Sequence, residues 1–219
     1  MDTRFFVIWM EEITAAVRAG RDHLTRLDAA IGDADHGTNL DRGFAAVAEA
    51  LAARPPDTPG GVLVLAGSTL IRKVGGASGP LYGTAFREMG KTLGDAADVS
   101  AADLASALEA GVAGVRRLGG AEEGDKTMVD ALAPAARAMA RSVGGGGGGD
   151  PEVAFAAAAA AAEEGAKATV PLVARKGRAS YLGARSAGHE DPGAASTALI
   201  VGALRAVAAR RSPRSRSRP

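Results

Sequence analysis

Apolar residues recur at helical spacing along most of the chain. Between residues 5 and 30, Ile13, Val17 and Leu24 follow one another at intervals of one or two helical turns, which places them on one face of an amphipathic helix. Glycine and proline clusters interrupt this pattern, and no run shows the two-residue alternation of a β-strand. The pattern therefore predicts an all-α chain of eight helices, at about residues 5–30, 38–53, 60–74, 80–93, 100–117, 127–142, 151–170 and 193–210.

The composition fits one helical domain. The 219 residues suffice for a single sizeable core, and 47% of them are hydrophobic but only 4% aromatic, so Ala, Leu and Val must build that core. Alanine has the highest helix propensity. The alanine tract 156–162 could be low-complexity disorder, but apolar neighbours such as Phe155 and Val170 favour a buried helix. The glycine run at Gly144–Gly149 predicts a flexible linker.

Three carboxylates gather where the first predicted helix ends. Asp28 falls in its last turn, and Asp33 and Asp35 lie in the loop beyond Gly32. Carboxylates crowded at a helix C-terminus are repelled by the partial negative charge there and by one another. A bound hard cation such as magnesium removes this repulsion. A calcium EF-hand is excluded, because the twelfth position counted from Asp33 is Phe44 and not glutamate. A magnesium site is predicted, with a solvated acidic turn as the alternative.

Two glycine-containing turns precede predicted helices. Gly75–Pro80 comes before a helix that we expect to begin at Pro80, with Ser78 just before it as the capping residue. Gly37–Asn39 opens the helix at 38–53. Free backbone N–H groups at a helix start suit an anion such as phosphate. The alternative is that both turns only connect helices.

A third glycine-rich stretch, Gly119–Thr127, is similar to a Walker A loop. Asp125 intervenes between Gly124 and Lys126, and no strand pattern precedes the stretch, so the sequence does not indicate a P-loop NTPase.

Charge is concentrated at the C-terminus. The net charge is +1, from 26 basic and 25 acidic residues, and five arginines lie in the last ten positions, so the remainder carries 1 − 5 = −4. We expect residues 210–219 to form a disordered, solvated basic tail; weak binding to nucleic acid or acidic lipid is the alternative. The apolar run Phe5–Met10 is too short to span a membrane. The expectation is a cytoplasmic protein with no membrane or nucleic-acid partner.

The chain contains no cysteine, which excludes disulfides, thiolate nucleophiles and zinc–thiolate sites.

Five motifs in order resemble the nucleotide-binding L subunit of dihydroxyacetone kinases, and the resemblance runs from about residue 5 to residue 209. The motifs are Gly32–Gly37, Gly75–Leu81, Gly124–Met128, Ala174–Gly183 and Gly188–Gly193. The resemblance implies a single domain at 1–209, folded as a barrel of eight antiparallel helices, which binds ADP or ATP through two magnesium ions.

The same resemblance implies the roles of individual residues. Asp28, Asp33 and Asp35 would be the metal ligands. The nucleotide phosphates would contact His36, Gly37, Thr38, Asn39, Ala77 and Ser78, and the adenosine half would contact Gly119, Met128, Arg178, Asp191, Pro192 and Gly193. From the residues alone, Arg178 could pair with phosphate, stack on adenine or be a surface arginine. Likewise, His36 could contact phosphate or only pack.

The implied function is phosphoryl transfer to dihydroxyacetone held by a partner K subunit, with no catalytic side chain on this chain beyond the metal–nucleotide site. Either ATP exchanges, or ADP stays bound and a phosphotransferase-system protein rephosphorylates it. The rival hypotheses are an ADP-carrying regulatory module that docks on a transcription factor, and a kinase subunit for another small ketose or polyol. We also expect Ala174–Gly193 to act as a lid.

Overall fold

The computed structural model describes residues 1–144 and 150–211, and in these residues it contains helices and no strand. The expected linker at 145–149 and the expected tail from residue 212 lie outside the described residues. The elements are α1 (Thr3–Ile31), α2 (His36–Ala53), α3 (Pro59–Lys73), α4 (Ser78–Leu93), α5 (Ala101–Gly119), α6 (Val129–Val143), α7 (Pro151–Ala168), the 3-10 helix η1 (Arg178–Ser186) and α8 (Pro192–Arg211).

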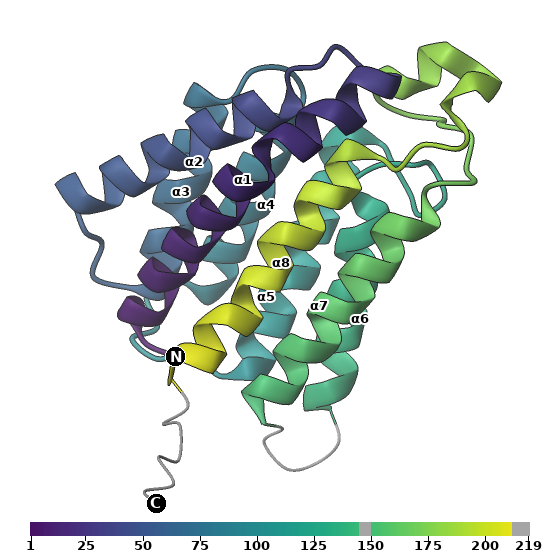
Figure 1. The fold of residues 1–219 in the computed structure, drawn as a ribbon. Helices are drawn as coiled ribbons and strands as arrows, with labels where there is room; N and C mark the ends of the chain where they lie inside the picture. Colours follow the sequence, from purple (N-terminus) through teal and green to yellow (C-terminus); the bar gives the residue numbers. More distant parts are fainter. Residues whose placement is uncertain (145–149, 212–219) are drawn as a thin grey trace, which may run out of the picture.

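The α-helices form a closed barrel. Each helix packs against the next one along the chain, consecutive helices run in opposite directions, and α8 packs against α1, which closes the ring (Figure 1). The predicted all-α fold is therefore confirmed. All eight helices lie within a few residues of the ranges expected from apolar spacing. The chain between α7 and α8 contains η1, which the apolar spacing did not predict.

Two helix ends differ from the expectation. Helix α4 begins at Ser78, so Ser78 is its first residue and not its cap, and Pro80 is its third. Proline is tolerated there because the N–H groups of a first helical turn have no partner within the helix. At the other end of the chain, Arg210 was assigned to the basic tail but lies in α8, where its guanidinium pairs with Glu12 of α1.

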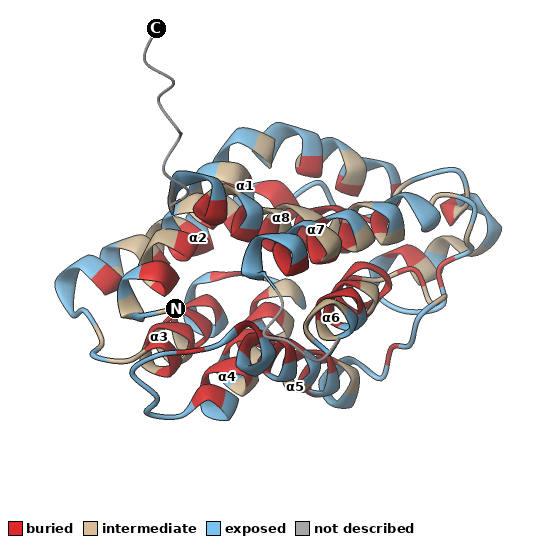
Figure 2. Ribbon diagram, turned by 90° about the horizontal axis from the view of Figure 1, so that it is seen from below, coloured by how far each residue is buried: buried red, intermediate tan, exposed pale blue. Residues whose placement is uncertain are grey.

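Buried residues face the interior of the barrel and exposed residues face outward (Figure 2). The apolar run near the N-terminus belongs to this core, with Phe6, Trp9 and Met10 at most 1% exposed. The alanine-rich segment forms α7, whose buried face is mostly alanine, so the helical interpretation of that segment is confirmed. Small side chains also let α3 and α4 approach closely: a Cβ atom added at Gly67 would lie 2.5 Å from the carbonyl oxygen of Gly83.

Helix α8 is a core element despite its composition. By length and mean hydropathy (1.4), Pro192–Arg210 could cross a membrane, but 61% of that stretch is buried in the barrel. A helix that is apolar on most of its surface and packed on several sides is usual in the core of a helical protein.

The alternation of helix direction decides where the connections lie. The connections α1–α2, α3–α4, α5–α6 and α7–α8 all fall at one end of the barrel (Figure 1). Each of the motifs noted in the sequence belongs to one of these four connections or to the helix ends beside it. The up-and-down topology therefore brings together motifs that are far apart in the sequence.

Candidate functional site

The four connections at this end surround a cavity of about 660 Å³. That volume lies within the range of small-molecule binding sites. Most of the predicted site residues line it, namely Asp28, Asp33, Asp35, His36, Ala77, Ser78, Gly119, Met128, Arg178, Asp191, Pro192 and Gly193. Three predicted residues, Gly37, Thr38 and Asn39, are not among the lining residues.

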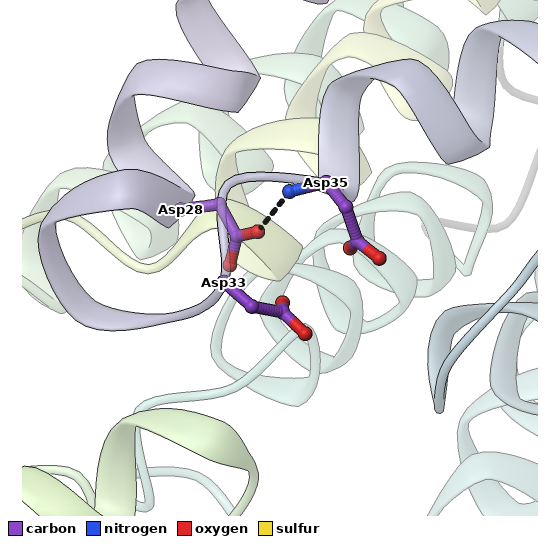
Figure 3. Close-up of side chains that lie close together, drawn as sticks. All are labelled: Asp28, Asp33 and Asp35. Carbon is purple, nitrogen blue, oxygen red and sulfur yellow. Dashed lines mark hydrogen bonds between the residues drawn. The ribbon is translucent and has the colours of Figure 1, made fainter.

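One side of the cavity, which we call the acidic wall, consists of Asp28, Asp33 and Asp35 (Figure 3). One carboxylate oxygen from each lies within 4.8 Å of the other two. Asp28 is buried in the last turn of α1, and Asp33 and Asp35 are exposed in the connection to α2, as the sequence predicted.

Asp28 also fixes the shape of the connection. Its Oδ2 accepts hydrogen bonds from the backbone N–H of Asp35, at 2.9 Å, and of His36, at 3.1 Å. Hydrogen bonds to an ionised carboxylate are stronger than those between neutral groups. The buried carboxylate therefore holds the start of α2 against the end of α1, and this contact sets the spacing of the other two carboxylates.

The acidic wall fits a hard divalent cation. Its donors are carboxylate oxygens, which magnesium prefers, and its two exposed members leave coordination positions open to water or to a ligand. Within residues 1–144 and 150–211, no other group of three or more acidic, histidine or cysteine side chains converges closely enough to share an ion.

A second side of the cavity, which we call the basic wall, consists of Arg175, Lys176 and Arg178 from the α7–α8 connection. The Arg178 guanidinium forms an ion pair with the carboxylate of Asp33. This hydrogen-bonded pair lowers the pKa of Asp33 from its ordinary value. The guanidinium of Arg178 thus lies against the acidic wall, whereas the resemblance assigned it to the adenosine half.

A third side of the cavity is the turn before α4. Gly75, Gly76, Ala77 and Ser78 line it, and no side chain caps the first turn of this helix. Gly76 has a φ of +67°, a left-handed conformation that favours glycine. The N-terminus of a helix carries partial positive charge, so this side of the cavity suits an anion.

His36, the first residue of α2, contacts side chains of α4 and α8. Its Nδ1 lies 3.1 Å from Oγ of Ser78, and its Nε2 lies 2.8 Å from Oγ of Ser196 in α8. Burial lowers the pKa of His36, against the opposing effect of nearby carboxylates such as Asp28. Because both ring nitrogens already have hydroxyl partners within the protein, a phosphate contact by this side chain stays a prediction.

The three predicted residues outside the lining have other surroundings. Gly37 lies where α1 and α2 touch, and a Cβ atom there would lie 2.0 Å from the carbonyl oxygen of Arg21. Thr38 is exposed. Asn39 is buried, and its Oδ1 accepts a hydrogen bond from Arg42 at 2.7 Å. Gly37 thus has a packing role, which only the contact between the two helices reveals.

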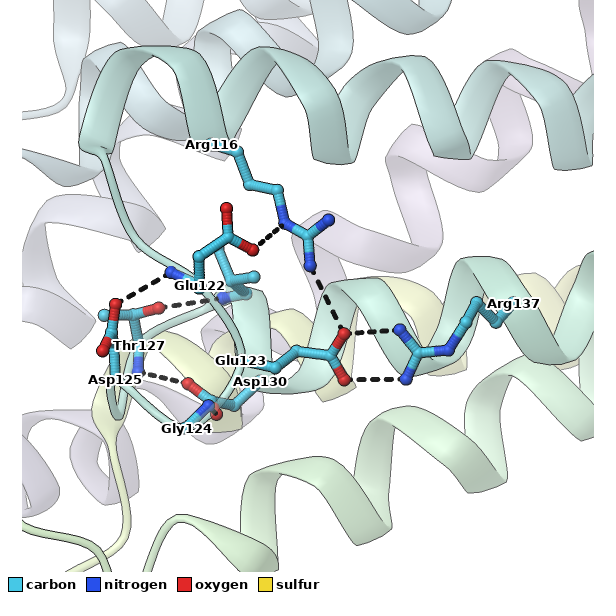
Figure 4. Close-up of polar contacts among 9 residues, drawn as sticks. Arg116, Glu122, Glu123, Gly124, Asp125, Thr127, Asp130 and Arg137 are labelled. Atoms are coloured by element: carbon cyan, nitrogen blue, oxygen red, sulfur yellow. Dashed lines mark hydrogen bonds and ion pairs between the residues drawn. The ribbon is translucent and has the colours of Figure 1, made fainter.

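The α5–α6 connection, residues 120–128, is held by charged side chains (Figure 4). The carboxylate of Glu123 accepts both NH groups of Arg137, at 2.5 and 2.7 Å, and Arg116 lies 3.3 Å from the same carboxylate. Asp130, at the start of α6, accepts from the backbone N–H groups of Gly124 and Thr127. Such contacts fix the loop that forms one side of the cavity.

Apolar side chains, which we call the apolar lining, also contribute to the cavity. They are Leu81, Val115, Ala121, Met128 and Val129. A cavity with both apolar and charged lining suits an aromatic ring linked to phosphates.

Several lining residues were not identified from the sequence, among them Arg175, Lys176, Lys126 and Thr127. The available signal was their position inside the motifs Ala174–Gly183 and Gly124–Met128.

Known proteins are similar to this chain. The ADP-binding subunit of the PEP-dependent dihydroxyacetone kinase of Escherichia coli is 41% identical over 195 residues, which cover 89% of this chain and 92% of that protein. The corresponding subunit of dihydroxyacetone kinase 1 of Listeria innocua is 39% identical over 196 residues, covering 90% and 92% of the two chains. The L-erythrulose 1-kinase of Mycolicibacterium smegmatis is 38% identical over 183 residues, but the match covers only 31% of that protein.

Among solved structures, the dihydroxyacetone kinase of C. freundii in complex with AMP-PNP and Mg2+ superposes with a TM-score of 0.70 at 29% identity. The match covers 91% of this chain and 33% of that chain. The DAK2 domain family matches residues 30–206. This match and the identities above show that the chain belongs to the DAK2 domain family and is a homologue of the ADP-binding subunits of dihydroxyacetone kinase.

Proposed function

We propose that this chain is the nucleotide-binding subunit of a dihydroxyacetone kinase, and that residues 1–209 form its domain. It binds magnesium-complexed ADP or ATP and passes a phosphoryl group to dihydroxyacetone held by a partner subunit. The observation that carries this proposal is the acidic wall, which lines a cavity of about 660 Å³ together with the basic wall. The names of the homologous ADP-binding subunits and the neighbour that contains AMP-PNP and Mg2+ support it.

In the proposed site, Asp28, Asp33 and Asp35 hold two magnesium ions. When bound, these ions neutralise charge on the phosphate oxygens. Asp28 is already fixed by two backbone N–H groups, so its carboxylate needs little rearrangement to bind metal.

The remaining groups of the chain position the nucleotide. The start of α4 offers backbone N–H groups to phosphate oxygens, and the basic wall offers cationic side chains. The apolar lining, which includes Met128, contacts the adenine ring. Phosphoryl transfer needs positioning and charge stabilisation with little covalent work by the protein, so no further side chain of this chain has to react.

The acceptor and the phosphoryl donor involve other proteins. We propose a dihydroxyacetone-binding K subunit as the partner that presents the acceptor hydroxyl. Several homologues are named as PEP- or PTS-dependent, which supports a phosphotransferase-system protein as donor to retained ADP and a cytoplasmic location. A four-carbon ketose is the second candidate acceptor, because erythrulose kinases are 37% and 38% identical over this domain.

The test is magnesium-dependent nucleotide binding, followed by transfer with a K subunit added. Mg-ADP binding is measured by calorimetry for the parent chain, for Asp33→Ala and for the control Asp95→Ala, whose carboxylate is exposed in the connection at the opposite end of the barrel. We expect binding by the parent and the control and none by Asp33→Ala. Equal binding by all three would contradict the metal assignment. Transfer to erythrulose in place of dihydroxyacetone would favour the second acceptor.

A further inference from the structure

Lys126 is a buried lysine whose partners are all backbone carbonyls. It lies in the α5–α6 connection and is 1% exposed. Its ammonium donates to the carbonyl oxygens of Thr169 (2.8 Å), Val170 (3.4 Å), Leu172 (3.1 Å) and His189 (2.5 Å). Lysine is almost never fully buried without such partners, so the position of this ammonium needs an explanation.

These four carbonyls come from the two ends of the α7–α8 connection. The ends also contact each other, because the N–H of Gly188 donates to the carbonyl of Val170 at 2.7 Å and the N–H of Asp191 donates to Oγ1 of Thr169 at 2.9 Å. Residues 173–187, which we call the lid segment, therefore begin and end at one point of the barrel, and Lys126 lies at that point. The lid segment carries the basic wall and η1.

The backbone of Lys126 is held in an unfavourable conformation. Its φ is +63°, in the left-handed region, which glycine adopts readily but a residue with a side chain adopts only at a cost in free energy. The loop around it is fixed from the other side, since Asp130 accepts from the N–H groups of Gly124 at 2.5 Å and Thr127 at 2.7 Å (Figure 4). The loop therefore directs this side chain inward. Burial lowers the pKa of the Lys126 ammonium, and the nearby carboxylates of Asp191 and Asp130 act in the opposite direction.

We propose that Lys126 is a positioning residue that anchors the lid segment and thereby sets how slowly bound nucleotide leaves the cavity. The second half of this statement rests on the proposed function. Without the ammonium, four carbonyls at the ends of the connection lose a donor, and buried carbonyls without a donor are costly. The connection then opens to water, and the basic wall loses its fixed distance from the acidic wall.

The experiment compares Lys126→Met with the matched control Lys167→Met. Lys167 is exposed in the last turn of α7, where it pairs with Glu164, so its substitution removes the same charge near the same segment. Hydrogen exchange of the nucleotide-free proteins is measured for amides 170–191, and the dissociation rate of Mg-ADP is measured by chase well below the melting temperature. For Lys126→Met we expect exchange of 170–191 and nucleotide release each to be at least about tenfold faster, with amides 28–36 unchanged. The control should match the parent.

A role confined to overall stability gives a different result. The melting temperature of Lys126→Met would then fall, while release of Mg-ADP and exchange of 170–191 stayed at parent values, or exchange would rise evenly over the whole barrel. Either result overturns the proposal. If Lys126→Met does not fold, Lys126→Gln takes its place, because its amide keeps two N–H donors but is shorter and uncharged.

The two halves of the proposal are separable. Exchange in the absence of nucleotide tests the anchoring of the lid segment whether or not the chain binds ADP. Failure of the parent chain to bind Mg-ADP would instead contradict the proposed function and, with it, the statement about nucleotide release.

Discussion

The acidic and basic walls of the cavity are built in opposite ways. The acidic wall comes from eight consecutive residues, Asp28 to Asp35, and is joined to two long helices by backbone hydrogen bonds. The basic wall lies on the long connection at 169–191, whose ends are fixed by Lys126. Exposure follows the same division: the side chain of Arg178 is 66% exposed, whereas that of its partner Asp33 is 39% exposed.

This difference separates two tasks of the proposed site. A metal site needs ligands at fixed distances, and short connections between helices provide them. A site that admits and releases a nucleotide needs a side that can move, and a long connection with few buried side chains provides it. We expect substitutions in the two walls to affect different steps.

The largest effect is expected in the acidic wall, where Asp28 should differ from its neighbours. Asp33→Asn and Asp35→Asn should each weaken magnesium-dependent ADP binding by at least about 100-fold, since loss of a ligand costs more than loss of a residue that only hydrogen-bonds to a ligand. Asp28→Asn should lose binding to the same extent and also destabilise the fold by about 1–3 kcal/mol, because it weakens two backbone hydrogen bonds to a buried charge. Calorimetry and chemical denaturation measure the two quantities. Equal stability of all three variants would show that Asp28 does not hold the start of α2.

A smaller effect is expected in the basic wall. The double variant Arg175→Gln/Lys176→Gln should weaken Mg-ADP binding by about tenfold, equivalent to ~1.4 kcal/mol, and the loss should shrink at high salt because these groups are exposed. Binding of magnesium alone should not change. Arg185→Gln is the control, because Arg185 is exposed in the same lid segment but does not line the cavity. A change in metal affinity in the double variant would contradict the division of tasks.

The pH dependence of stability offers a third test, at the point where the connection of the basic wall meets α8. Burial raises the pKa of Asp191 to about 7, against the opposing effect of the Ala194 N–H, which donates to it. An aspartate in the unfolded chain has an ordinary pKa near 4 and releases its proton above that pH, whereas the folded state keeps the proton on Asp191 up to about pH 7. Stability contributed by this group is present at low pH and should fall by about 1 kcal/mol per unit between roughly pH 5 and 7. In Asp191→Asn, the free energy of unfolding, measured by chemical denaturation, should depend less on pH in that window. If its slope against pH is unchanged, other groups cause the pH dependence.

The smallest effect is expected at the C-terminus. Deletion of residues 212–219 should leave the melting temperature, ADP retention and transfer unchanged, since a segment of arginine, serine and proline buries little apolar surface. A longer deletion from Arg210 should cost about 1 kcal/mol, because it also removes the ion pair between the exposed guanidinium of Arg210 and the carboxylate of Glu12, whose side chain is only 12% exposed. Reduced transfer at unchanged ADP binding would show that the tail contacts the partner subunit.

Apolar spacing and turn residues determined most of the fold in advance. The helices fall where the spacing predicted them because helix formation depends on neighbours within a few turns. Asp28 in a last turn, with Asp33 and Asp35 just beyond it, follows from the same local signals. The turn before α4 also follows from these local signals. The capping role expected for Ser78 was wrong by one position, because the cap and the first turn of a helix offer similar environments to a serine.

Closure of the barrel decided the rest. The contact of Arg178 with Asp33 spans 145 residues, and the contact of His36 with Ser196 spans 160. The inward direction of Lys126 likewise depends on carbonyls more than 40 residues away, at 169–189. Local sequence carries no information on such distances, because they are set by how the last helix packs against the first. The sequence by itself therefore determined the helices and the spacing of the three carboxylates, and the tertiary structure determined which side chains line the cavity together.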